Sequence, residues 1–373
     1  GYAPQKLFLR ITMFLKSLSL TNFINHAEVQ FTFNEKVNCI VGKNGSGKTN
    51  LLDAIHYLCF CKSYFSHQDI SSIRFEADFF AIHGIFADAE SQPIKVSCTY
   101  KNGRKVMKAH NKEYERFSDH IGLFPLIMVS PYDNDIINEG SEQRRRFFDI
   151  AISQYDKEYL ACLIQYQKAL AQRNFLLKQS FQRTIDPSLL DLYNEQMKIA
   201  GSYIFEKRRE YINEVLPDIK KYYAYLASDE EVVDVTYHSQ LVEEDFDSGF
   251  QKMMSQDLKL GYSCFGIHKD DFIFTINQKS VKKFASQGQQ KSFSLSLKLS
   301  QYDYIRSKSR AVPILLLDDI FDKLDRNRIN RLLNLVGEKH FQQVFITDTD
   351  EERVSEILET HHIEGQIFNV SLR

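Results

Sequence analysis

The chain lacks any hydrophobic run long enough to cross a membrane. Its longest apolar stretches fall well short of the roughly 20 residues that span a bilayer, so the sequence predicts no transmembrane segment and no membrane partner. An excess of one charge is also lacking, because 47 basic residues oppose 49 acidic ones and leave a formal net charge of −2. Any contact with nucleic acid must therefore come from local patches.

Paired metal-ligand spacings are also lacking among the cysteines. No CxxC pair occurs among the six of them, and several lie in apolar surroundings. The simplest interpretation is reduced, structural thiols in a cytoplasmic protein, with no zinc site expected. Glycine and proline are sparse between about residues 142 and 225, which favours long helices there.

A glycine-rich loop stands out near the N-terminus, where residues 42–49 read GKNGSGKT. A loop of this pattern exposes successive backbone N–H groups around a β-phosphate, while its lysine reaches the terminal phosphates and its hydroxyl binds Mg²⁺. The apolar run at residues 37–41 predicts a buried strand before the loop, and the apolar spacing from residue 51 onward predicts a helix after it. The phosphates would then lie at a helix N-terminus. An ordinary glycine-rich turn is the alternative interpretation.

We therefore predict ATP and Mg²⁺ as cofactors. Lys48 would contact the terminal phosphates and Thr49 the metal ion. The predicted nucleotide-binding residues of the loop are Gly42, Lys43, Asn44, Gly45, Ser46, Gly47, Lys48 and Thr49.

An acidic element lies near the other end of the chain, where residues 313–319 read PILLLDD. The continuous apolar run is typical of a central parallel strand that is covered on both faces. Asp318 would hold Mg²⁺, directly or through water, and Asp319 would orient or deprotonate the attacking water. A strand that ends in an acidic turn is the alternative. Since Lys48 and Asp318 are far apart in sequence, a P-loop domain that contains both needs a large insertion.

A third element, residues 286–290, reads SQGQQ and precedes a helical pattern. Ser286, Gly288 and Gln289 would present donors to an anion at a helix start. Because the chain already has one phosphate loop, we expect this second cradle to contact the γ-phosphate held by another copy, which predicts a homodimer that forms on ATP. A simple polar helix cap explains the segment equally well when it is considered alone.

Taken in this order, and followed by FDKLD at residues 321–325, these motifs resemble ABC-type ATPases of the SMC and DNA-repair branch, and within it the RecF family. The resemblance extends over LKSLSLTNF (15–23), VSPYDNDIINEGSEQRRRFFD (129–149), YQKALAQRN (166–174), HKDD (268–271) and FASQGQQKSFSLSLKLS (284–300). It implies an α/β fold, in which an ABC-type P-loop ATPase lobe with a mixed sheet and flanking helices carries an inserted helical lobe.

The same resemblance implies an ATP-dependent recombination mediator that binds gapped duplex or single/double-strand junction DNA and supports recombinase loading. It also implies a RecR-like mediator as partner. Two other classes stay open. A transporter's nucleotide-binding subunit would use a Gln and a His that are missing near residues 130–131 and 347–348, so the γ-phosphate sensor is unassigned. A defence ATPase of the overcoming-lysogenization type would normally add a nuclease domain.

The chain also departs from the family pattern at individual positions. Ser46 replaces a common Gln, which backbone-mediated binding should tolerate, whereas Ile24 and Phe65 stand where the family has Arg. Asp319 is shorter than the Glu of many ABC-type sites, which predicts slow hydrolysis. Family likeness also directs attention to Arg144, Arg145 and Arg146 as DNA contacts, with a solvated helix face or an ion pair between lobes as alternatives.

Strand patterns at residues 28–33, 79–86 and 272–276 flank the helical middle. We predict a leader or extension remnant at 1–12, an ATPase lobe formed by 13–105 and 256–373, and an inserted, mainly helical lobe at 106–255. Apolar helical faces are expected to include Leu160, Leu163 and Ile164, and later Leu189, Leu192, Met197 and Ile204. For His268, Asp270 and Asp271, a turn held by Asp side chains is favoured over a metal site.

Overall fold

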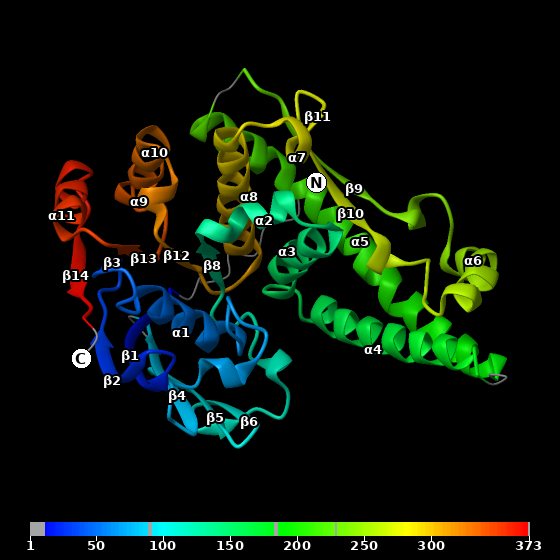
Figure 1. Cartoon of the computed structure of the whole chain (residues 1–373). Coiled ribbons are helices and arrows are strands. Elements are labelled where there is room, and N and C mark those ends of the chain that lie inside the picture. Colours follow the sequence, from blue (N-terminus) through cyan, green and yellow to red (C-terminus); the bar gives the residue numbers. More distant parts are fainter. Residues whose placement is uncertain (1–11, 89–91, 183–185, 228–229, 372–373) are drawn as a thin grey trace, which may run out of the picture. The chain divides into compact units, whose positions relative to one another are not determined.

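A computed structural model describes residues 12–88, 92–182, 186–227 and 230–371 (Figure 1). The predicted leader lies outside the described residues except for residue 12. The chain divides into two compact units. Unit 1 comprises Gly1–Asp133, Tyr225–Ala227 and Leu297–Arg373, and unit 2 comprises Asn134–Ala224 and Ser228–Ser296.

Unit 1 contains a five-stranded parallel sheet with the strand order β14-β3-β13-β12-β8. Every residue of β3, β12, β13 and β8 is buried, as the continuous apolar runs in these segments predict. The sheet therefore joins segments from both ends of the chain. Its strands are β3 (Val37–Val41), β8 (Leu126–Val129), β12 (Ile314–Leu317), β13 (Gln343–Asp348) and β14 (Gly365–Asn369).

A six-stranded antiparallel sheet forms the second layer of unit 1, in the order β2-β1-β4-β5-β6-β7. Its central strands alternate between buried and less buried side chains, which is the pattern of a sheet with one face on the core. The strands are β1 (Phe14–Phe23), β2 (His26–Thr32), β4 (Phe79–Ala87), β5 (Ile94–Lys101), β6 (Arg104–Ala109) and β7 (Lys112–Glu113).

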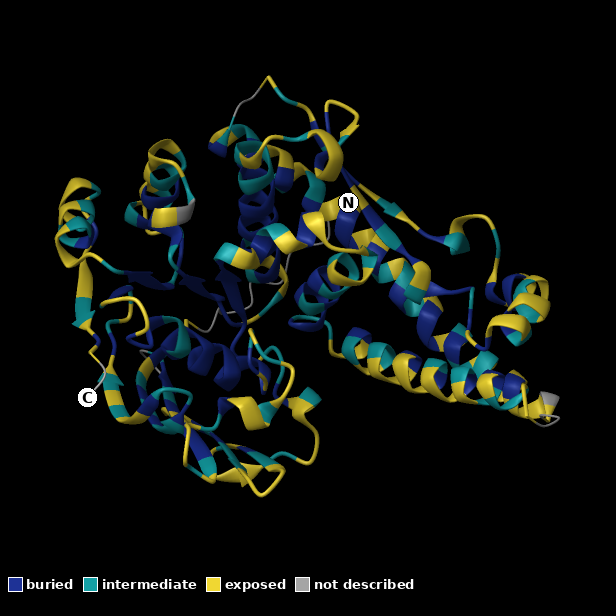
Figure 2. Cartoon of the chain, viewed as in Figure 1, coloured by how far each residue is buried: buried dark blue, intermediate teal, exposed yellow. Residues whose placement is uncertain are grey.

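Helix α1 (Lys48–Phe60) packs against strands of both sheets. All of its residues except Thr49 and Asn50 are buried, and most of the helix is therefore dark blue in Figure 2. Gly84 of β4 allows the close approach, because a Cβ at this position would lie 2.5 Å from a methyl carbon of Leu58. The helix that follows the glycine-rich loop is thus a central element of the hydrophobic core.

Short helices complete unit 1 after β12 and β13. Asp325 and Asp350 cap two of them by accepting a hydrogen bond from the backbone N–H of the third helical residue, which is Arg328 in one helix and Arg353 in the other. The helices are α9 (Ile320–Lys323), α10 (Arg326–Gly337) and α11 (Glu351–Thr360), and the C-terminal part of α8 (Gln287–Lys308) also belongs to this unit.

Unit 2 is mainly helical but includes a three-stranded antiparallel sheet with the order β11-β10-β9. The sequence did not predict β9, which buries Val233 and Val235 on one face. The elements are α2 (Asp135–Asn138), α3 (Ser141–Ser153), α4 (Lys157–Gln179), α5 (Pro187–Leu226), β9 (Val233–His238), α6 (Phe246–Leu260), β10 (Asp271–Ile276), β11 (Lys279–Ser280) and α7 (Val281–Phe284).

Two fully buried arginines hold unit 2 together. Arg208 of α5 pairs with Asp149 at 3.0 Å and with Asp270 at 2.8 Å, and Arg173 of α4 pairs with Asp257 at 2.7 Å. Removing one partner of such a pair leaves an uncompensated buried charge, which costs about 3–5 kcal/mol. These contacts explain why long polar side chains occur within the helical core.

The HKDD segment forms part of this buried network. His268 Nδ1 lies 2.8 Å from the Tyr166 hydroxyl and its Nε2 lies 3.0 Å from the Ser263 carbonyl oxygen, while burial lowers the pKa of His268 to about 4. No group of three or more His, Cys, Asp or Glu side chains within the described ranges is placed to hold a metal ion. The segment therefore supports the fold of unit 2.

The predicted helical faces are partly wrong. Ile164 is 41% exposed and Leu192 is 51% exposed, whereas α4 buries Tyr159, Tyr166 and Arg173. Hydrophobic spacing alone missed this face because tyrosine and arginine side chains satisfy their polar ends inside unit 2.

None of the helices in the described part of the chain is long and apolar enough to span a membrane.

The two compact units and the predicted domain limits differ in detail. Residues 126–129, which the sequence assigned to the inserted lobe, form β8 and pair with β12 in the parallel sheet of unit 1. Residues 271–276, assigned to the ATPase lobe, form β10 in unit 2. Contacts between distant segments, which local patterns do not reveal, account for both differences. The division into folding domains stays a prediction.

Candidate nucleotide-binding site

The glycine-rich loop has a backbone shape that depends on two of its glycines. Gly45 and Gly47 have φ angles of 80° and 95°, in the left-handed region where a side chain is strained. A Cβ on Gly47 would also lie 2.6 Å from His26 Nε2, whereas nothing lies within 4 Å of a Cβ on Gly45. The loop therefore leaves open space beside Gly45, where a ligand can approach the backbone.

Lys48 lies at the start of α1 with its ammonium group turned back onto the loop. Its Nζ donates to the carbonyl oxygens of Gly42 at 2.7 Å and Lys43 at 3.0 Å, and its side chain is largely buried. The helix N-cap, Gly47, provides no side-chain cap. The first N–H groups of α1 and the helix dipole thus favour an anion at this position.

The turn between β1 and β2 supports the loop from one side. Asn25 Nδ2 donates to the Gly45 carbonyl at 3.2 Å, and His26 Nε2 donates to the Gly47 carbonyl at 3.0 Å. Burial lowers the pKa of His26, which favours the neutral imidazole. Asn50 Nδ2 in turn donates to Asn25 Oδ1 at 2.8 Å. No local pattern in the sequence connects the turn with the loop, so these residues were not predicted.

Thr49 and Asp318, the two predicted metal ligands, lie side by side. Thr49 Oγ1 donates to Asp318 Oδ1 at 3.0 Å, although the two residues come from opposite ends of the chain. Asp318 directly follows β12 and is only 3% exposed. Burial raises its pKa, the negative charge of Asp319 raises it further, and hydrogen bonds from Thr347 and Thr49 lower it. The carboxylate is thus placed where a cation would relieve the cost of its burial.

Asp319 is the N-cap residue of α9, has a φ of 49° and is half-buried. Its backbone N–H donates to Thr347 Oγ1 at 2.9 Å, and the same hydroxyl donates to Asp318 Oδ1 at 2.8 Å. Thr347 therefore links the two predicted catalytic carboxylate residues. The sequence pointed to this position only as the place of a missing histidine, so the bridging role of the threonine hydroxyl was not foreseen.

Asp53 is a further buried carboxylate on α1, one turn after Thr49. It is 1% exposed and accepts hydrogen bonds from Ser63 Oγ and the Tyr64 N–H, both at 2.7 Å. Burial raises its pKa to about 6, and the charge of Asp318 raises it as well. Asp53 thereby fixes the segment that follows α1 and adds a titratable group near the acidic site.

The segment after β8 corresponds to the position where transport ATPases carry a Gln. Here the Ser130 N–H donates to Asp133 Oδ2 at 2.8 Å, and Asp133 Oδ1 pairs with Lys298 Nζ at 3.1 Å. Both charged side chains are 8% exposed. A buried ion pair therefore orders this loop in place of an amide side chain.

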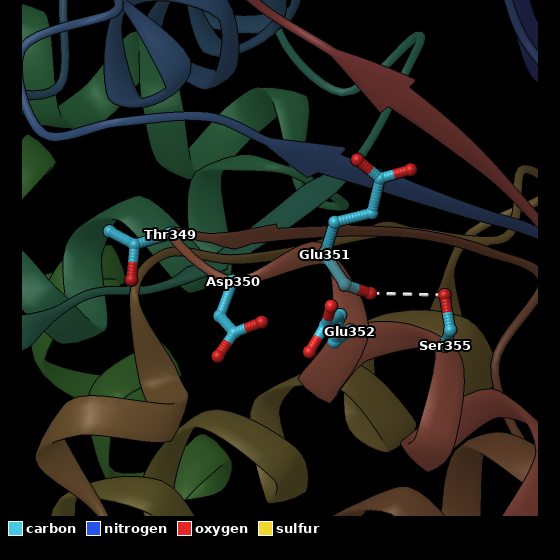
Figure 3. Close-up of a pocket in the computed structure, with 5 residues that line it drawn as sticks. All are labelled: Thr349, Asp350, Glu351, Glu352 and Ser355. Atoms are coloured by element: carbon cyan, nitrogen blue, oxygen red, sulfur yellow. Dashed lines mark hydrogen bonds between the residues drawn. The ribbon is translucent and has the colours of Figure 1, made fainter.

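A pocket beyond the carboxyl end of β13 is lined by Thr349, Asp350, Glu351, Glu352 and Ser355 (Figure 3). Asp350 caps α11 and the two glutamates occupy its first turn, where they complement the helix dipole. Ser355 Oγ donates to the Glu351 carbonyl at 3.0 Å. Because its lining carries three carboxylates, this pocket is unsuited to a phosphate group.

The loop and the acidic site together fit ATP and Mg²⁺. The loop offers glycine backbone, an uncapped helix N-terminus and an ammonium group, and Thr49 with Asp318 offers the oxygen ligands that Mg²⁺ prefers. Mg²⁺ in such sites commonly takes one or two carboxylates plus phosphate oxygens, so this small set of protein ligands is sufficient. The structure thus brings together Lys48, Thr49, Asp318 and Asp319 within unit 1.

The SQGQQ segment lies in unit 2, at the start of α8, and two of its backbone donors already have partners. Ser286 Oγ accepts from the Gln289 N–H at 3.2 Å, and Gln289 Oε1 accepts from the Ser286 N–H at 2.7 Å. This reciprocal pair is a capping box. The segment forms the helix cap that the sequence offered as one alternative, and its role at a second copy's phosphate stays a prediction.

The three candidate DNA-contacting arginines lie in α3 of unit 2 and differ in their surroundings. Arg144 forms two hydrogen bonds to Asp271, at 2.7 and 2.9 Å, and Arg145 donates to the Asp270 carbonyl at 2.7 Å. Arg146 is half-buried and has no ion pair with the described residues. Arg144 is thus held in an ion pair, but one that lies within unit 2, whereas Arg146 has the most freedom to meet an external phosphate.

Fold and site define the class as an ABC-type ATPase with the architecture of an SMC head. A solved Smc head domain with an extended coiled coil from Pyrococcus furiosus superposes with a TM-score of 0.56 at 16% identity, covering 97% of this chain and 94% of that one, which concerns the fold alone. The family model of the RecF/RecN/SMC N terminal domain matches residues 14–367.

Within that class, the chain belongs to the RecF family of DNA replication and repair proteins. It is 45% identical to RecF of Flavobacterium johnsoniae over 96% of this chain and 100% of the relative, and 43% identical to RecF of Bacteroides thetaiotaomicron over 96% and 97%. A solved structure of the recombination mediator protein RecF-ATPrS in the RecFOR pathway has a TM-score of 0.87 at 30% identity, covering 97% of each chain. The family resemblance and the fold class predicted from the sequence are confirmed.

Proposed function

We propose that the chain is an ATP-gated DNA-binding recombination mediator. The observation that carries this proposal is the contact of Thr49 with Asp318, joined through Thr347 to Asp319, beside a loop that holds Lys48. Membership of the RecF family favours this function over the transporter subunit and the defence ATPase. Solved family members with ATP and ATPrS support ATP as the nucleotide.

Each residue of the site has a proposed task. Backbone N–H groups of residues 42–49 bind the phosphates, Lys48 moves from its loop carbonyls to the terminal phosphates, and Thr49 and Asp318 hold the metal ion. When bound, Mg²⁺ neutralises negative charge on the terminal phosphates. Asp319 orients the attacking water or accepts its proton, and Thr347 holds Asp318 and Asp319 in register.

The proposed assembly is a homodimer that closes on ATP. Ser286, Gly288 and Gln289 of one copy would contact the γ-phosphate bound to the loop of the other. Because the nucleotide touches both copies only in the closed state, ATP favours closure by that difference in affinity. Hydrolysis removes the γ-phosphate contact and lets the dimer open. We expect slow turnover because Asp319 has a shorter side chain than the Glu of many ABC-type sites.

The proposed DNA target is gapped duplex or a single/double-strand junction, and the proposed protein partner is a RecR-like mediator. A net charge of −2 gives no overall attraction to DNA, so a local basic patch must bind it. Arg146 is the best-placed side chain of α3 for such a contact. The pathway in which solved relatives are placed supports a partner of the recombination machinery. Binding would follow the phosphate backbone and weaken strongly with salt.

Sizing the protein with and without ATP and short gapped duplex tests the proposal. Wild type should self-associate and retain the duplex only with ATP. Lys48→Ala should lose both by losing the nucleotide, whereas Ser286→Arg should bind nucleotide as a single copy. Lys112→Ala, an exposed lysine of β7, is the matched control and should behave as wild type. If nucleotide changes neither assembly nor DNA retention in wild type, the mediator function is wrong.

A further inference from the structure

Glu231 makes close contacts with the segment that the proposed function assigns to the γ-phosphate of a second copy. This half-buried residue precedes β9, and its Oε1 accepts a hydrogen bond from Gln289 Nε2 at 2.5 Å. Its other carboxylate oxygen accepts from the Tyr223 hydroxyl at 2.5 Å. All three residues belong to unit 2.

Tyr223 gives this carboxylate a fixed anchor. The tyrosine ring belongs to α5, is fully buried, and packs edge-on against Phe293 of α8 with ring centroids 6.1 Å apart. Phe293 is fully buried as well. Since the hydroxyl that holds Glu231 is attached to a packed ring, the carboxylate is oriented by the core of unit 2 and not by solvent-exposed groups.

The side-chain amide of Gln289 therefore has a partner at each end. Its Nε2 is held by Glu231, and its Oε1 accepts the Ser286 N–H. The Gln289 N–H in turn is bonded to Ser286 Oγ. Two backbone donors that an incoming phosphate would need are thus engaged inside the protomer.

An anion that binds this helix start must displace the capping contacts, which satisfy backbone donors that the first turn of the helix leaves unpaired. A hydrogen bond to a carboxylate is roughly twice as strong as a neutral one, so Glu231 holds the amide in the capping geometry. Its bond to Nε2 also polarises the amide and strengthens Oε1 as an acceptor. The negative charge of Glu231 also repels an approaching phosphate, which likewise favours the capped arrangement.

We propose that Glu231 is a positioning residue that keeps the SQGQQ segment capped on itself and thereby raises the threshold for closure over a second copy's γ-phosphate. The inference rests on the proposed function, but the capping part of it concerns one copy alone. In this arrangement the segment exchanges an internal partner for the phosphate, and Glu231 sets how readily that exchange occurs.

Amide hydrogen exchange in the nucleotide-free protein tests the capping role. Glu231→Gln removes the charge at constant size, and Tyr223→Phe removes only the hydroxyl that orients the carboxylate. Both should raise exchange at the Ser286 and Gln289 amides several-fold, with Glu231→Gln showing the larger rise. Asp234→Asn on β9, a half-buried carboxylate paired with Lys220, is the control and should leave these amides unchanged. Unchanged exchange in Glu231→Gln would overturn the proposal.

Sedimentation with a slowly hydrolysed ATP analogue tests the effect on closure. Glu231→Gln should lower the dimer dissociation constant roughly 3- to 10-fold, which corresponds to about 0.7–1.4 kcal/mol. A constant equal to or higher than that of wild type would contradict the role in closure. If wild type itself does not associate with the analogue, the proposed function fails, while the exchange experiment still decides whether Glu231 holds the cap.

Discussion

The glycine-rich loop of unit 1 and the SQGQQ segment of unit 2 are both helix starts suited to an anion, but they are prepared differently. The loop begins α1 without a side-chain cap, and Asn25 and His26 support its carbonyl oxygens from outside. The SQGQQ segment begins α8 with Ser286 and Gln289 capping each other. The first site has no side-chain cap to displace, although Lys48 must leave the Gly42 and Lys43 carbonyls, whereas the second must give up its capping contacts.

This difference suggests an order of events. A preorganised site loses little on binding, so the nucleotide should occupy the loop of a single copy first. The second site contributes only when a phosphate already bound by another copy replaces its internal contacts. The same two motifs thus separate affinity for nucleotide from closure of the dimer.

Asp319→Asn should separate hydrolysis from binding most strongly. Loss of a general base typically lowers the rate 10²- to 10⁴-fold, so we expect ATP hydrolysis to fall at least about 100-fold. Nucleotide affinity should stay near that of wild type, because Asp319 is proposed to act on the water and not on the loop. Phosphate release and fluorescent-nucleotide titration measure the two quantities. Equal losses in hydrolysis rate and nucleotide affinity would mean that Asp319 acts in binding. The control Asp319→Glu keeps the carboxylate and should still hydrolyse ATP.

Gly47→Ala should damage the preorganised loop. The alanine would require a left-handed φ of 95° and would place its Cβ 2.6 Å from His26 Nε2. Strain of about 1–2 kcal/mol together with the displaced His26 contact should weaken ATP binding roughly 10-fold or more in calorimetry. Gly140→Ala, where nothing lies within 4 Å of the added Cβ, should bind ATP normally. A normal affinity in Gly47→Ala would show that the loop adapts.

Asp53 gives unit 1 a predicted pH dependence. Its folded pKa is raised to about 6 by burial, whereas the ordinary value is 3.8, so its contribution to stability is complete below pH 4 and is lost as pH rises through 6. The free energy of unfolding of wild type relative to Asp53→Asn should fall by about 2–3 kcal/mol between pH 4 and pH 7. Urea unfolding measures it, and a constant difference would show that Asp53 does not titrate in this range.

Arg146→Ala should produce the smallest effect, on DNA alone. Loss of one phosphate contact should weaken binding about 3- to 10-fold and reduce the salt slope by about one. Arg209→Ala, which removes an exposed arginine paired with Glu206, is the matched control. Fluorescence anisotropy with gapped duplex at several salt concentrations measures both values. An unchanged slope in Arg146→Ala would remove α3 from the proposed DNA contact.

Local patterns predicted those parts of the fold that local patterns determine. The apolar runs that became β3 and β12, the glycine loop and the start of α1 were all visible in the sequence, because contiguous residues form each of them. Their pairing in one sheet was implied by the family resemblance and not by any spacing. The buried face of α4 was missed, since it is built from tyrosines and an arginine whose partners lie far along the chain.

The candidate site shows the same limit. Lys48, Thr49, Asp318 and Asp319 belong to motifs and could be named from sequence, although their catalytic roles stay predictions. Thr347, by contrast, acquires its position only when β13 lies beside β12. Asn25, His26 and Glu231 likewise have no motif of their own, because each supports a loop through contacts that exist only after folding.

Helix α1 presents Thr49 at one end and fills the space between two sheets along the rest of its length. Nucleotide binding to the loop should consequently raise the thermal stability of the entire unit. A ligand at 100 times its dissociation constant adds about 2.7 kcal/mol to the native state. Melting temperature therefore offers a simple titration for ranking nucleotides and analogues without any assay of turnover or DNA.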